Sequence, residues 1–284
     1  MSIAQLFLIT NHTNLHVGAG SSNQGVIDSL IQRDHVDGLP GIHSSSLKGA
    51  LREFFKEGPD KSTLSSKISD IFGSEADSNS QSKGNYIFHD GILLSYPVRS
   101  DKEPFFNAIA PMVFERLLEN IELLNLPINF DFETKLKELA SYNFEKYPTV
   151  FNYTTTHKFK IEEFVVEGVN TKNDSSDAFK MIESLCGERL VMFNNEDFKT
   201  ITDDYNLPVI ARNQLENGAS KNLFYEQVVP RKTKFYFFAS NYSSNNDLNS
   251  CIDNKRIQIG ANGSIGYGLC NFLFLNNILK PKTT

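Results

Sequence analysis

The chain has 284 residues, of which 40% are hydrophobic and 22% are charged, which places it among soluble globular proteins of one large domain or two small ones. Its formal net charge of −6 argues against a free-standing nucleic-acid binder, because such proteins are usually basic. Three cysteines without a Cys-x-x-Cys pair indicate neither a disulfide framework nor a thiolate zinc site, and six histidines without His-Glu-x-x-His spacing give no support to a structural metal.

The N-terminal segment is predicted to be a strand that leads into a long loop. Residues 3–11 alternate and carry Leu, Phe and Ile, which is typical of a strand. Their apolar run is too short for a signal core or a membrane span, and no basic leader precedes it, so we expect a cytoplasmic protein with no membrane partner. Residues 18–43 are predicted to form the loop, and loops of that length in a compact domain tend to be functional or disordered.

The stretch after this loop has the pattern of an amphipathic helix. Apolar residues recur with the spacing i, i+3, i+4, i+7 and i+8, which places them on one buried stripe. These residues are Leu47, Ala50, Leu51, Phe54 and Phe55. We therefore predict a helix over residues 44–57, ended by Gly58-Pro59.

The start of this helix is a candidate anion site. The hydroxyls of Ser44-Ser45-Ser46 can cap the free amides there, beside the partial positive charge of the helix N-terminus. Lys48 and Arg52 lie four residues apart on one face of the helix. The helix dipole contributes only about 0.3–1 kcal/mol, so the cations must supply most of any phosphate affinity. The alternative is an ordinary amphipathic helix with a solvated charged face, which also carries Glu53 and Glu57.

The remainder of the chain mixes helices and strands without a regular repeat, which favours an α+β sandwich over a doubly wound sheet. We predict helices over residues 62–72, 111–124, 132–140 and 178–185, and an acidic helix or turn over residues 196–205. We predict a hairpin or extended strands over residues 150–167, and strands over residues 86–94, 190–193, 209–212, 223–238, 256–259 and 269–275. Residues 73–85 are rich in Ser, Asn, Asp and Gln and are predicted to be a mobile surface loop. Aromatic residues between 150 and 230 either stack on bases or, as is more common, pack in the core.

Several short sequences, in order along nearly the whole chain, resemble the signature of the RAMP superfamily of CRISPR proteins. They are Gly18-Ala19-Gly20, Ile27-Asp28-Ser29-Leu30-Ile31-Gln32-Arg33, Gly38-Leu39-Pro40 with Ser44-Ser45-Ser46-Leu47-Lys48-Gly49-Ala50-Leu51-Arg52, Asp90-Gly91-Ile92-Leu93-Leu94-Ser95-Tyr96-Pro97-Val98-Arg99-Ser100, Asn222-Leu223-Phe224-Tyr225-Glu226 followed by Pro230, and Ile257-Gln258-Ile259-Gly260 with Ile265-Gly266-Tyr267-Gly268. One glycine-rich piece would be a weak indication, but these pieces in this order are specific. Within the superfamily the chain most resembles the backbone subunit of the type III-B Cmr complex.

The resemblance implies an α+β fold, namely a ferredoxin-like, RRM-type palm with large insertions that include a thumb hairpin. It implies a single RAMP domain over residues 1–284. The palm would comprise residues 1–149 and 231–284, and the thumb region would be inserted over residues 150–230.

The function implied by the resemblance is that of a backbone subunit, which polymerises along CRISPR RNA and cleaves complementary target RNA at regular intervals in antiviral defence. Its partners would be CRISPR RNA, target RNA, copies of itself in a filament and the other Cmr subunits. Within the assembled complex it would be a metal-dependent endoribonuclease. We expect the isolated chain to bind RNA weakly, because its net charge is negative and a subunit shares its RNA with its neighbours.

The position that matches the family's catalytic aspartate is Asp28. Cleavage in the family is attributed to attack by a ribose 2′-hydroxyl on the adjacent phosphate, assisted by a divalent ion such as Mg²⁺. A carboxylate at Asp28 either binds that cation or accepts the hydroxyl proton, and one carboxylate makes only a weak metal site. His16 and Glu226 match polar positions near the cut in relatives. They either assist proton transfer or, more simply, position the loop and thumb through hydrogen bonds.

The resemblance also implies contacts with RNA along the chain. The residues concerned are Arg33, Ser45, Ser46, Lys48, Arg52, Arg99, Gly260 and Gly263, with further phosphate contacts in the Arg231-Lys232-x-Lys234 cluster. The chain departs from its relatives in one place, because they tend to carry Gly-Gly-Asp-Glu-Thr where this sequence has Gly260-Ala261-Asn262-Gly263-Ser264. The acidic groups of that loop are therefore absent here.

Two other functions stay open at this point. The chain is alternatively a non-catalytic RNA-binding scaffold of a type III complex, in which Asp28 only shapes its loop, as loop aspartates usually do. It is otherwise the equivalent backbone subunit of a type III-A complex. The segments Ile31-Gln32-Arg33 and Phe224-Tyr225-Glu226 favour type III-B over type III-A.

Overall fold

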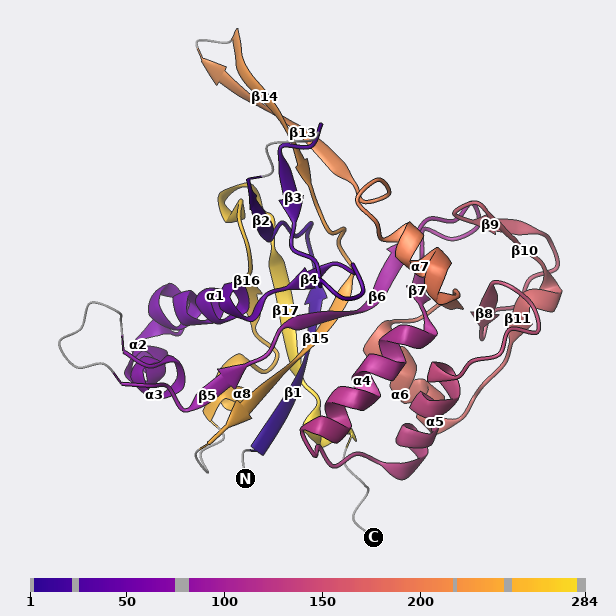
Figure 1. Cartoon of the computed structure of the whole chain (residues 1–284), viewed down its shortest axis with the longest axis horizontal. Coiled ribbons are helices and arrows are strands. Elements are labelled where there is room, and N and C mark those ends of the chain that lie inside the picture. Colours follow the sequence, from indigo (N-terminus) through magenta and orange to yellow (C-terminus); the bar gives the residue numbers. More distant parts are fainter. Residues whose placement is uncertain (1–2, 22–25, 75–81, 217–218, 243–246, 280–284) are drawn as a thin grey trace. The chain divides into compact units, whose positions relative to one another are not determined.

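A computed structural model describes residues 3–21, 26–74, 82–216, 219–242 and 247–279 of the chain (Figure 1). The chain divides into two compact units. The first unit comprises Met1–Ile92, Asp203–Lys232 and Tyr236–Phe274. The second unit comprises Leu93–Thr202, Thr233–Phe235 and Leu275–Thr284.

The core of the first unit is a sheet around the N-terminal strand β1 (Ile3–Asn11). β1 pairs antiparallel with β17 (Leu269–Phe274), which in turn pairs antiparallel with β16 (Arg256–Gln258). On its other side β1 neighbours β15 (Lys234–Asn241), whose end pairs with β5 (Tyr86–Phe88). All residues of β15 except the first are buried, so its aromatic residues belong to the core.

Helix α1 (Ser44–Glu57) packs beside β16 in the first unit, and its apolar stripe explains why. Leu47, Leu51, Phe54 and Phe55 are buried as the sequence predicts, whereas Ala50 is only half-buried. The chain then turns into the remaining helical segments of this unit. They are α2 (Lys61–Leu64), η1 (Ser65–Lys67), α3 (Ile68–Phe72), α8 (Asp247–Ile252) and η3 (Gly263–Ile265).

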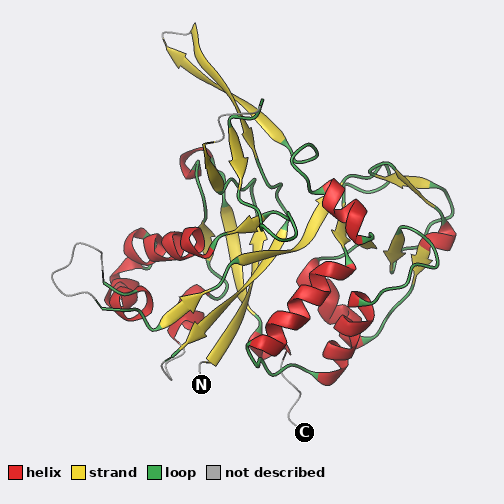
Figure 2. Ribbon diagram, in the orientation of Figure 1, coloured by secondary structure: helices red, strands yellow, loops and turns green. Residues whose placement is uncertain are grey.

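A second, smaller sheet of the first unit contains a long hairpin, β13 (Val209–Glu216) and β14 (Ala219–Gln227), which extends away from the large sheet (Figures 1 and 2). β14 pairs with β3 (Ser29–Ile31), and β3 pairs with β2 (Gly18–Ser21). The prediction of one long loop over residues 18–43 is therefore wrong. The same segment also contains β4 (Gly41–Ile42), which pairs with the start of β6 (Gly91–Val98).

The second unit contains a sheet of short strands and the longer helices of the middle of the chain. β7 pairs antiparallel with β6 and parallel with β12, and β12 pairs antiparallel with β8. The elements are β7 (Phe106–Ile109), α4 (Pro111–Leu123), α5 (Phe130–Ala140), β8 (Thr149–Phe151), β9 (Phe159–Ile161), β10 (Phe164–Val166), η2 (Gly168–Asn170), β11 (Thr171–Lys172), α6 (Asp177–Cys186), β12 (Leu190–Met192), α7 (Asn195–Ile201) and α9 (Asn276–Leu279). α4 begins with Pro111, and the side chain of Asn129 caps α5 by accepting from the amides of Asp131 and Phe132.

The prediction of a mixed helix-and-strand fold without regular alternation is confirmed (Figure 2). The expected insertion over residues 150–230 contributes to both units, and its long hairpin covers only Val209 to Gln227. Residues 75–81 of the predicted surface loop lie outside the described residues. No helix in the described part of the chain has the length and apolar character that a membrane span requires.

Leu51→Ala is expected to lower the free energy of unfolding by about 2–5 kcal/mol, because it leaves a cavity under a fully buried position of α1. Guanidinium denaturation followed by circular dichroism measures the change. The matched control is Glu53→Ala in the same helix, which changes an exposed side chain and is expected to shift stability by less than about 0.5 kcal/mol. Equal losses in the two variants would contradict the packing described for α1.

Candidate functional site

The backbone of β14 fixes Asp28, which lies immediately before β3. The amide of Asp28 donates to the carbonyl of Tyr225 at 3.1 Å, and the amide of Tyr225 donates to Asp28 Oδ2 at 2.7 Å. The residue is exposed, and its Oδ1 has no hydrogen-bond partner among the described residues. Asp28 is thus held through one carboxylate oxygen and presents the other to solvent.

His16 lies buried behind Asp28, with both ring nitrogens in hydrogen bonds. Nδ1 is 2.6 Å from the carbonyl oxygen of Gln227, and Nε2 is 3.1 Å from Ser29 Oγ. Because a carbonyl can only accept, Nδ1 carries the proton, and in the neutral ring Nε2 accepts from the Ser29 hydroxyl. The imidazole is therefore fixed between β14 and the residue that follows Asp28.

Glu226 is also buried, and donors reach both of its carboxylate oxygens. Asn262 Nδ2 donates to Oε1 at 2.7 Å, and an Arg212 guanidinium nitrogen (NH1) donates to Oε2 at 3.3 Å. The distance from Oε1 to His16 Nε2 is 3.6 Å. The Glu226 carboxylate is therefore fixed in position, since each of its oxygens accepts a hydrogen bond from within the protein.

Two glutamines fix the C-terminal end of β3. The buried Gln227 accepts from the amide of Ile31 through Oε1 at 3.1 Å and donates to Asp204. Gln32 Nε2 donates to Ser46 Oγ at 2.9 Å, and Gln32 Oε1 accepts from the amide of His43 at 2.8 Å. Extended chain from Asp28 to Gln32 spans ~13 Å, so β3 joins the aspartate directly to the start of α1.

The start of α1 differs from the sequence-based expectation. The serine hydroxyls were expected to cap the free amides, but the carboxylate of Asp90 accepts from the amide of Ser44 at 2.6 Å. Ser46 Oγ is bonded to Gln32, and Ser45 is exposed. The expectation that the serines cap the helix is therefore wrong. Asp90 already supplies a negative charge where a phosphate would benefit from the helix dipole.

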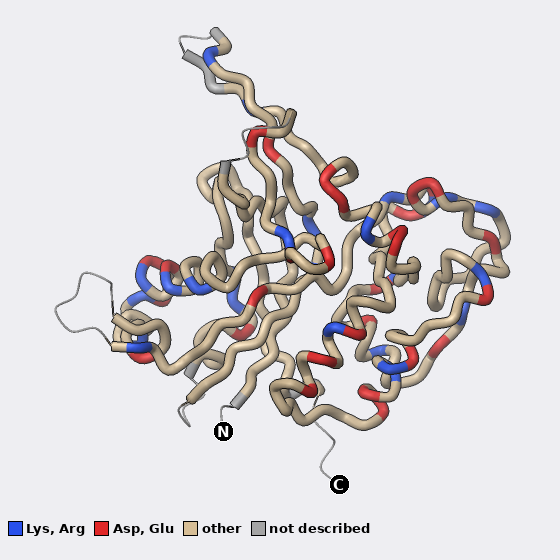
Figure 3. Tube along the Cα trace, viewed as in Figure 1, with Lys and Arg blue, Asp and Glu red and all other residues tan. Residues whose placement is uncertain are grey.

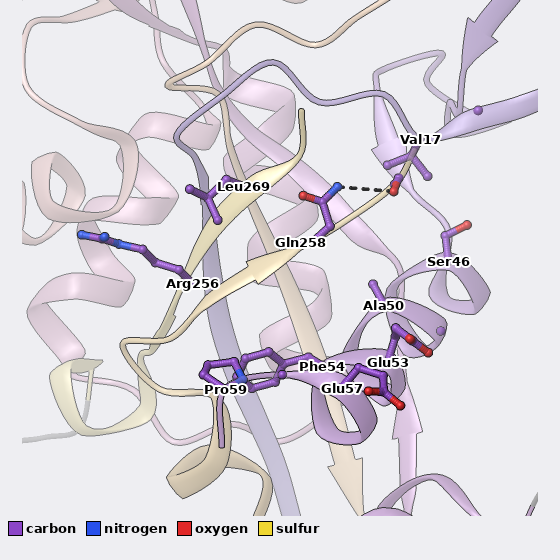
Figure 4. Close-up of a pocket in the computed structure, with 14 residues that line it drawn as sticks. Val17, Ser46, Ala50, Glu53, Phe54, Glu57, Pro59, Arg256, Gln258 and Leu269 are labelled. Atoms are coloured by element: carbon purple, nitrogen blue, oxygen red, sulfur yellow. Dashed lines mark hydrogen bonds between the residues drawn. The ribbon is translucent and has the colours of Figure 1, made fainter. Parts of the chain in front are cut away.

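A groove of about 700 Å³ runs between α1 and β16 within the first unit (Figure 4). Its lining residues include Ser46, Gly18 and Gly260 at one end and an apolar floor of Ala50, Phe54, Pro59 and Leu269. Glu53 and Glu57 line the α1 side, and the side chain of Arg256 extends away from them (Figure 4). The two glutamates disfavour a phosphate chain along the whole groove, but not at its serine and glycine end.

Lys48 and Arg52 do not line this groove. Both side chains are half-buried on α1, and neither makes a hydrogen bond or ion pair with any described residue. Figure 3 shows that basic and acidic residues both occur along this helix. The two cations are therefore available to an external anion.

Two other predicted cations have acidic partners inside the protein. Arg33 Nε lies 2.7 Å from Asp204 Oδ1, and an Arg33 guanidinium nitrogen (NH1) donates to the Gly38 carbonyl at 2.7 Å. Arg99 belongs to the second unit, where its guanidinium lies 2.8 Å from Glu162. The hydrogen bond that Arg99 donates to the Glu162 carboxylate raises the pKa of Arg99. Neither arginine joins the group of residues around Asp28.

Close internal approach requires a glycine at position 260 of the C-terminal loop. Gly260 has a φ of +75°, and a Cβ there would lie 2.2 Å from the carbonyl oxygen of His16. The amide of Ala261 donates to that same carbonyl at 2.9 Å. At Gly263 an added Cβ would lie 2.9 Å from the side chain of Gln258. The loop is thus seated on the segment that carries His16.

The residues around Asp28 suit Mg²⁺ only as a weakly held ion. No group of three or more His, Cys, Asp or Glu side chains in the described part of the chain has the arrangement of a metal site. The oxygens of Glu226 and both nitrogens of His16 have protein partners, which leaves Asp28 Oδ1 as the available oxygen of this cluster. Mg²⁺ is commonly held by one or two carboxylates together with substrate phosphates and water. Asp28 with an RNA phosphate fits that donor set.

Several residues of this site were not identified from the sequence. Gln32 and Gln227 lie in or next to the short sequences that resemble the family signature, but their role depends on partners far along the chain. Arg212 and Asn262 meet at Glu226 although 50 residues separate them. No local spacing signals such a contact, so the sequence alone does not reveal it.

A model of the RAMP superfamily matches residues 8–271 of the chain. The chain is 28% identical over 291 residues to the CRISPR system Cmr endoribonuclease Cmr4 of Pyrococcus furiosus, an alignment that covers 95% of this chain and 94% of the relative. The aligned region thus includes nearly every element described above.

Two solved structures have the same fold. One is the type III-B Cmr-beta bound to cognate target RNA, for which a chain matches with a TM-score of 0.77 and 23% identity over 98% of this chain and 99% of that chain. The other is oligomeric Cmr4 from Pyrococcus furiosus, with a TM-score of 0.68 and 24% identity over 96% of this chain and 98% of that chain.

Gly260→Ala is expected to destabilise the protein more than Gly266→Ala does. Both positions have positive φ, which costs a residue with a Cβ about 1–2 kcal/mol, but only Gly260 approaches another backbone. Gly266 has no atom within 4 Å of an added Cβ and is the matched control. Chemical denaturation of the two variants measures the difference. Equal losses would show that the loop is not seated on the His16 carbonyl.

Proposed function

The chain belongs to the RAMP superfamily, and from that membership we propose that it is the backbone subunit of a type III-B CRISPR ribonucleoprotein. In this function it assembles with copies of itself and with other Cmr subunits along CRISPR RNA in the cytoplasm and cleaves complementary target RNA at regular intervals. The relative with 28% identity is an endoribonuclease by name, and a similar structure is bound to target RNA. The observation that carries the proposal is Asp28, exposed at the hairpin base with one free carboxylate oxygen.

The proposed division of the fold follows the family. The sheet of β1, β15, β16 and β17 with α1 is the ferredoxin-like palm, and the hairpin β13–β14 is the thumb. The hairpin supports this assignment because its base pairs with the segment that carries Asp28. A movement of the thumb would therefore displace the Asp28 carboxylate.

In the proposed reaction the target RNA supplies its own nucleophile. The 2′-hydroxyl of one ribose attacks the adjacent phosphorus, a cyclic phosphate forms, and the bond to the 5′-oxygen of the next nucleotide breaks. Asp28 Oδ1 is the protein group available to accept the 2′-hydroxyl proton, while the Tyr225 amide fixes Oδ2. The leaving 5′-oxygen takes up a proton from solvent.

A divalent ion bound between Asp28 and the RNA would stabilise charge on the phosphate. Asp28 would be its protein ligand, and phosphate oxygens and water would supply the remainder. Much of the rate enhancement would come from positioning, since in-line geometry of a 2′-oxygen, phosphorus and leaving oxygen is worth several orders of magnitude.

His16 and Glu226 are proposed to position this site rather than to transfer protons. His16 bonds through both ring nitrogens, and Glu226 through both carboxylate oxygens, to other parts of the protein. Burial and these bonds make it costly for either side chain to turn towards RNA. Asp28 meets no such cost.

Guide-RNA phosphates are proposed to bind beside the start of α1. Lys48 and Arg52 are the available cations there, and Ser45 and the end of the groove at Ser46 and Gly260 lie nearby. Arg33 and Arg99 make ion pairs within the protein, so we assign them a smaller share of the affinity. Two α1 cations without an ion pair among the described residues, on a chain of net charge −6, agree with weak binding by an isolated subunit that strengthens in the filament.

A non-catalytic RNA scaffold is the second candidate function. The hydrogen bond from the Tyr225 amide to Asp28 favours it, because the same bond would be present if the aspartate only shaped the hairpin base. The equivalent subunit of a type III-A complex would retain the same site. Sequencing of the RNA that copurifies with the protein, together with native mass spectrometry of its partners, separates the two complexes.

Asp28→Asn is expected to lower the target-cleavage rate constant of the assembled complex by about 10²- to 10⁴-fold and to leave guide binding and assembly unchanged. The side-chain oxygen of the introduced asparagine can still accept from the Tyr225 amide. The substitution therefore removes the negative charge and keeps the hydrogen bond. Asp203→Asn is the matched control, since Asp203 shapes a turn by accepting from the amides of Tyr205 and Asn206. Cleavage at the wild-type rate by the Asp28→Asn complex would favour the scaffold function.

Alanine at Lys48 or Arg52 is expected to weaken RNA-dependent assembly and to reduce the slope of log affinity against log salt by about 1 for each cation. Filter binding at several salt concentrations measures the slope. Lys137→Ala serves as the control, because Lys137 pairs with Glu133 on an exposed helix of the second unit. An unchanged slope would show that the α1 cations do not contact phosphate.

A further inference from the structure

Three segments that are distant in the sequence meet at the carboxylate of Glu226. Arg212 comes from β13, Asn262 from the C-terminal glycine loop, and Glu226 itself from β14. Besides their bonds to Glu226, Arg212 and Asn262 contact each other, with the Arg212 guanidinium donating to Asn262 Oδ1 at 2.7 Å. These three residues form a closed triangle, which we call the Glu226 clamp.

The side chains of the clamp are held firmly in this arrangement. The Arg212 guanidinium lies over the ring of Phe224, with 5.2 Å from Cζ to the ring centroid. Asn262 has a left-handed backbone (φ 65°, ψ 24°), and its carbonyl accepts from the amides of Ile265 and Tyr267. Asparagine tolerates this conformation better than most residues with a side chain. The loop conformation therefore aims the Asn262 amide at Glu226.

The clamp is adjacent to the residue that holds Asp28. Tyr225, which exchanges two hydrogen bonds with Asp28, directly precedes Glu226 in β14. Glu226 pairs in parallel register with Ser29, the residue after Asp28. Side chains alternate along a strand, so the clamp holds the Glu226 side chain on one face of β14. The backbone of the preceding residue, Tyr225, makes the two hydrogen bonds to Asp28. Any shift of β14 at this point moves the carboxylate.

We propose that Arg212 and Asn262 are positioning residues for RNA cleavage, which act through Glu226 to lock the hairpin base onto the glycine loop and so fix Asp28. The inference rests on the proposed function. The clamp needs its cation, because a buried carboxylate that loses a charged partner is left uncompensated in a medium of low polarity. Asn262 supplies a neutral donor to the clamp, and Arg212 supplies its positive charge.

The experiment compares Arg212→Gln, Asn262→Ala and the double variant Arg212→Gln/Glu226→Gln in the assembled complex. Single-turnover cleavage of target RNA is measured beside the dissociation constant for that RNA. Hydrogen–deuterium exchange of the isolated chain reports the peptides that contain residues 26–33 and 262–268. Arg189→Gln is the matched control, because Arg189 pairs with Glu103 at 3.0 Å in the second unit with comparable exposure.

Each single substitution is expected to lower the cleavage rate constant roughly 10- to 100-fold, because small displacements of a reacting group are costly, while the affinity for target RNA is retained. Exchange in the two peptides accelerates. The double variant recovers most of the rate, because two amides leave no unpaired buried charge. Such recovery is not expected if Arg212 acts directly on the RNA, since the cation is still missing.

Three results would overturn the inference. Exchange and cleavage like those of Arg189→Gln would show that the clamp holds nothing. Faster exchange with an unchanged cleavage rate would make the clamp structural only. A double variant as slow as Arg212→Gln alone would assign the arginine a direct role. The wild-type complex is assayed in parallel. If it does not cut target RNA, the proposed function itself is contradicted, which is a different outcome from the three above.

Discussion

The pairing of a three-residue strand, β3, with the base of a long hairpin is the constraint on which the candidate site depends. The amide of Asp28 donates to the carbonyl of Tyr225, and the amide of Tyr225 donates to the Asp28 carboxylate, across 197 positions of sequence. Gln227 secures the other end of β3. Without this pairing, Asp28 would be an ordinary aspartate in a polar segment. With it, the carboxylate has a fixed direction and a fixed distance from the start of α1.

The uneven distribution of hydrogen bonds explains how one acid can be singled out in such a polar cluster. His16, Glu226, Gln32 and Gln227 all lie near β3, and each has its hydrogen-bonding atoms engaged by other segments. Burial makes those bonds expensive to break, since an unsatisfied group cannot turn to water. The hydrogen bonds that engage these four side chains within the protein also hold the strand beside Asp28 in place.

The sequence predicted the helices that have a clear apolar stripe. It failed for the elements whose structure depends on partners far away in the sequence. Helix α1 follows from a five-residue apolar stripe, and the spacing of Phe132, Leu136 and Leu139 predicted most of α5, though not its cap at Asn129. β2, β3 and β4 have two to four residues each and little hydrophobic pattern, so their segment was predicted to be a loop. Asp28 was found through a motif, whereas Arg212, Asn262 and Asp90 carry no local signal of their contacts.

Acidic side chains lie at the start of α1 and along its groove, whereas two cations of the same helix lack an acidic partner among the described residues. This distribution bears on how an acidic protein can bind RNA. Asp90 neutralises the helix start, and Glu53 and Glu57 face the groove, so neither the helix dipole nor the groove as a whole attracts a phosphate chain. On α1, attraction comes from Lys48 and Arg52, which have no acidic partner among the described residues. A site with so few cations binds weakly alone, and copies arranged in a row supply the remainder through repeated contacts on one strand. The acidic composition therefore argues for binding that depends on assembly rather than against binding.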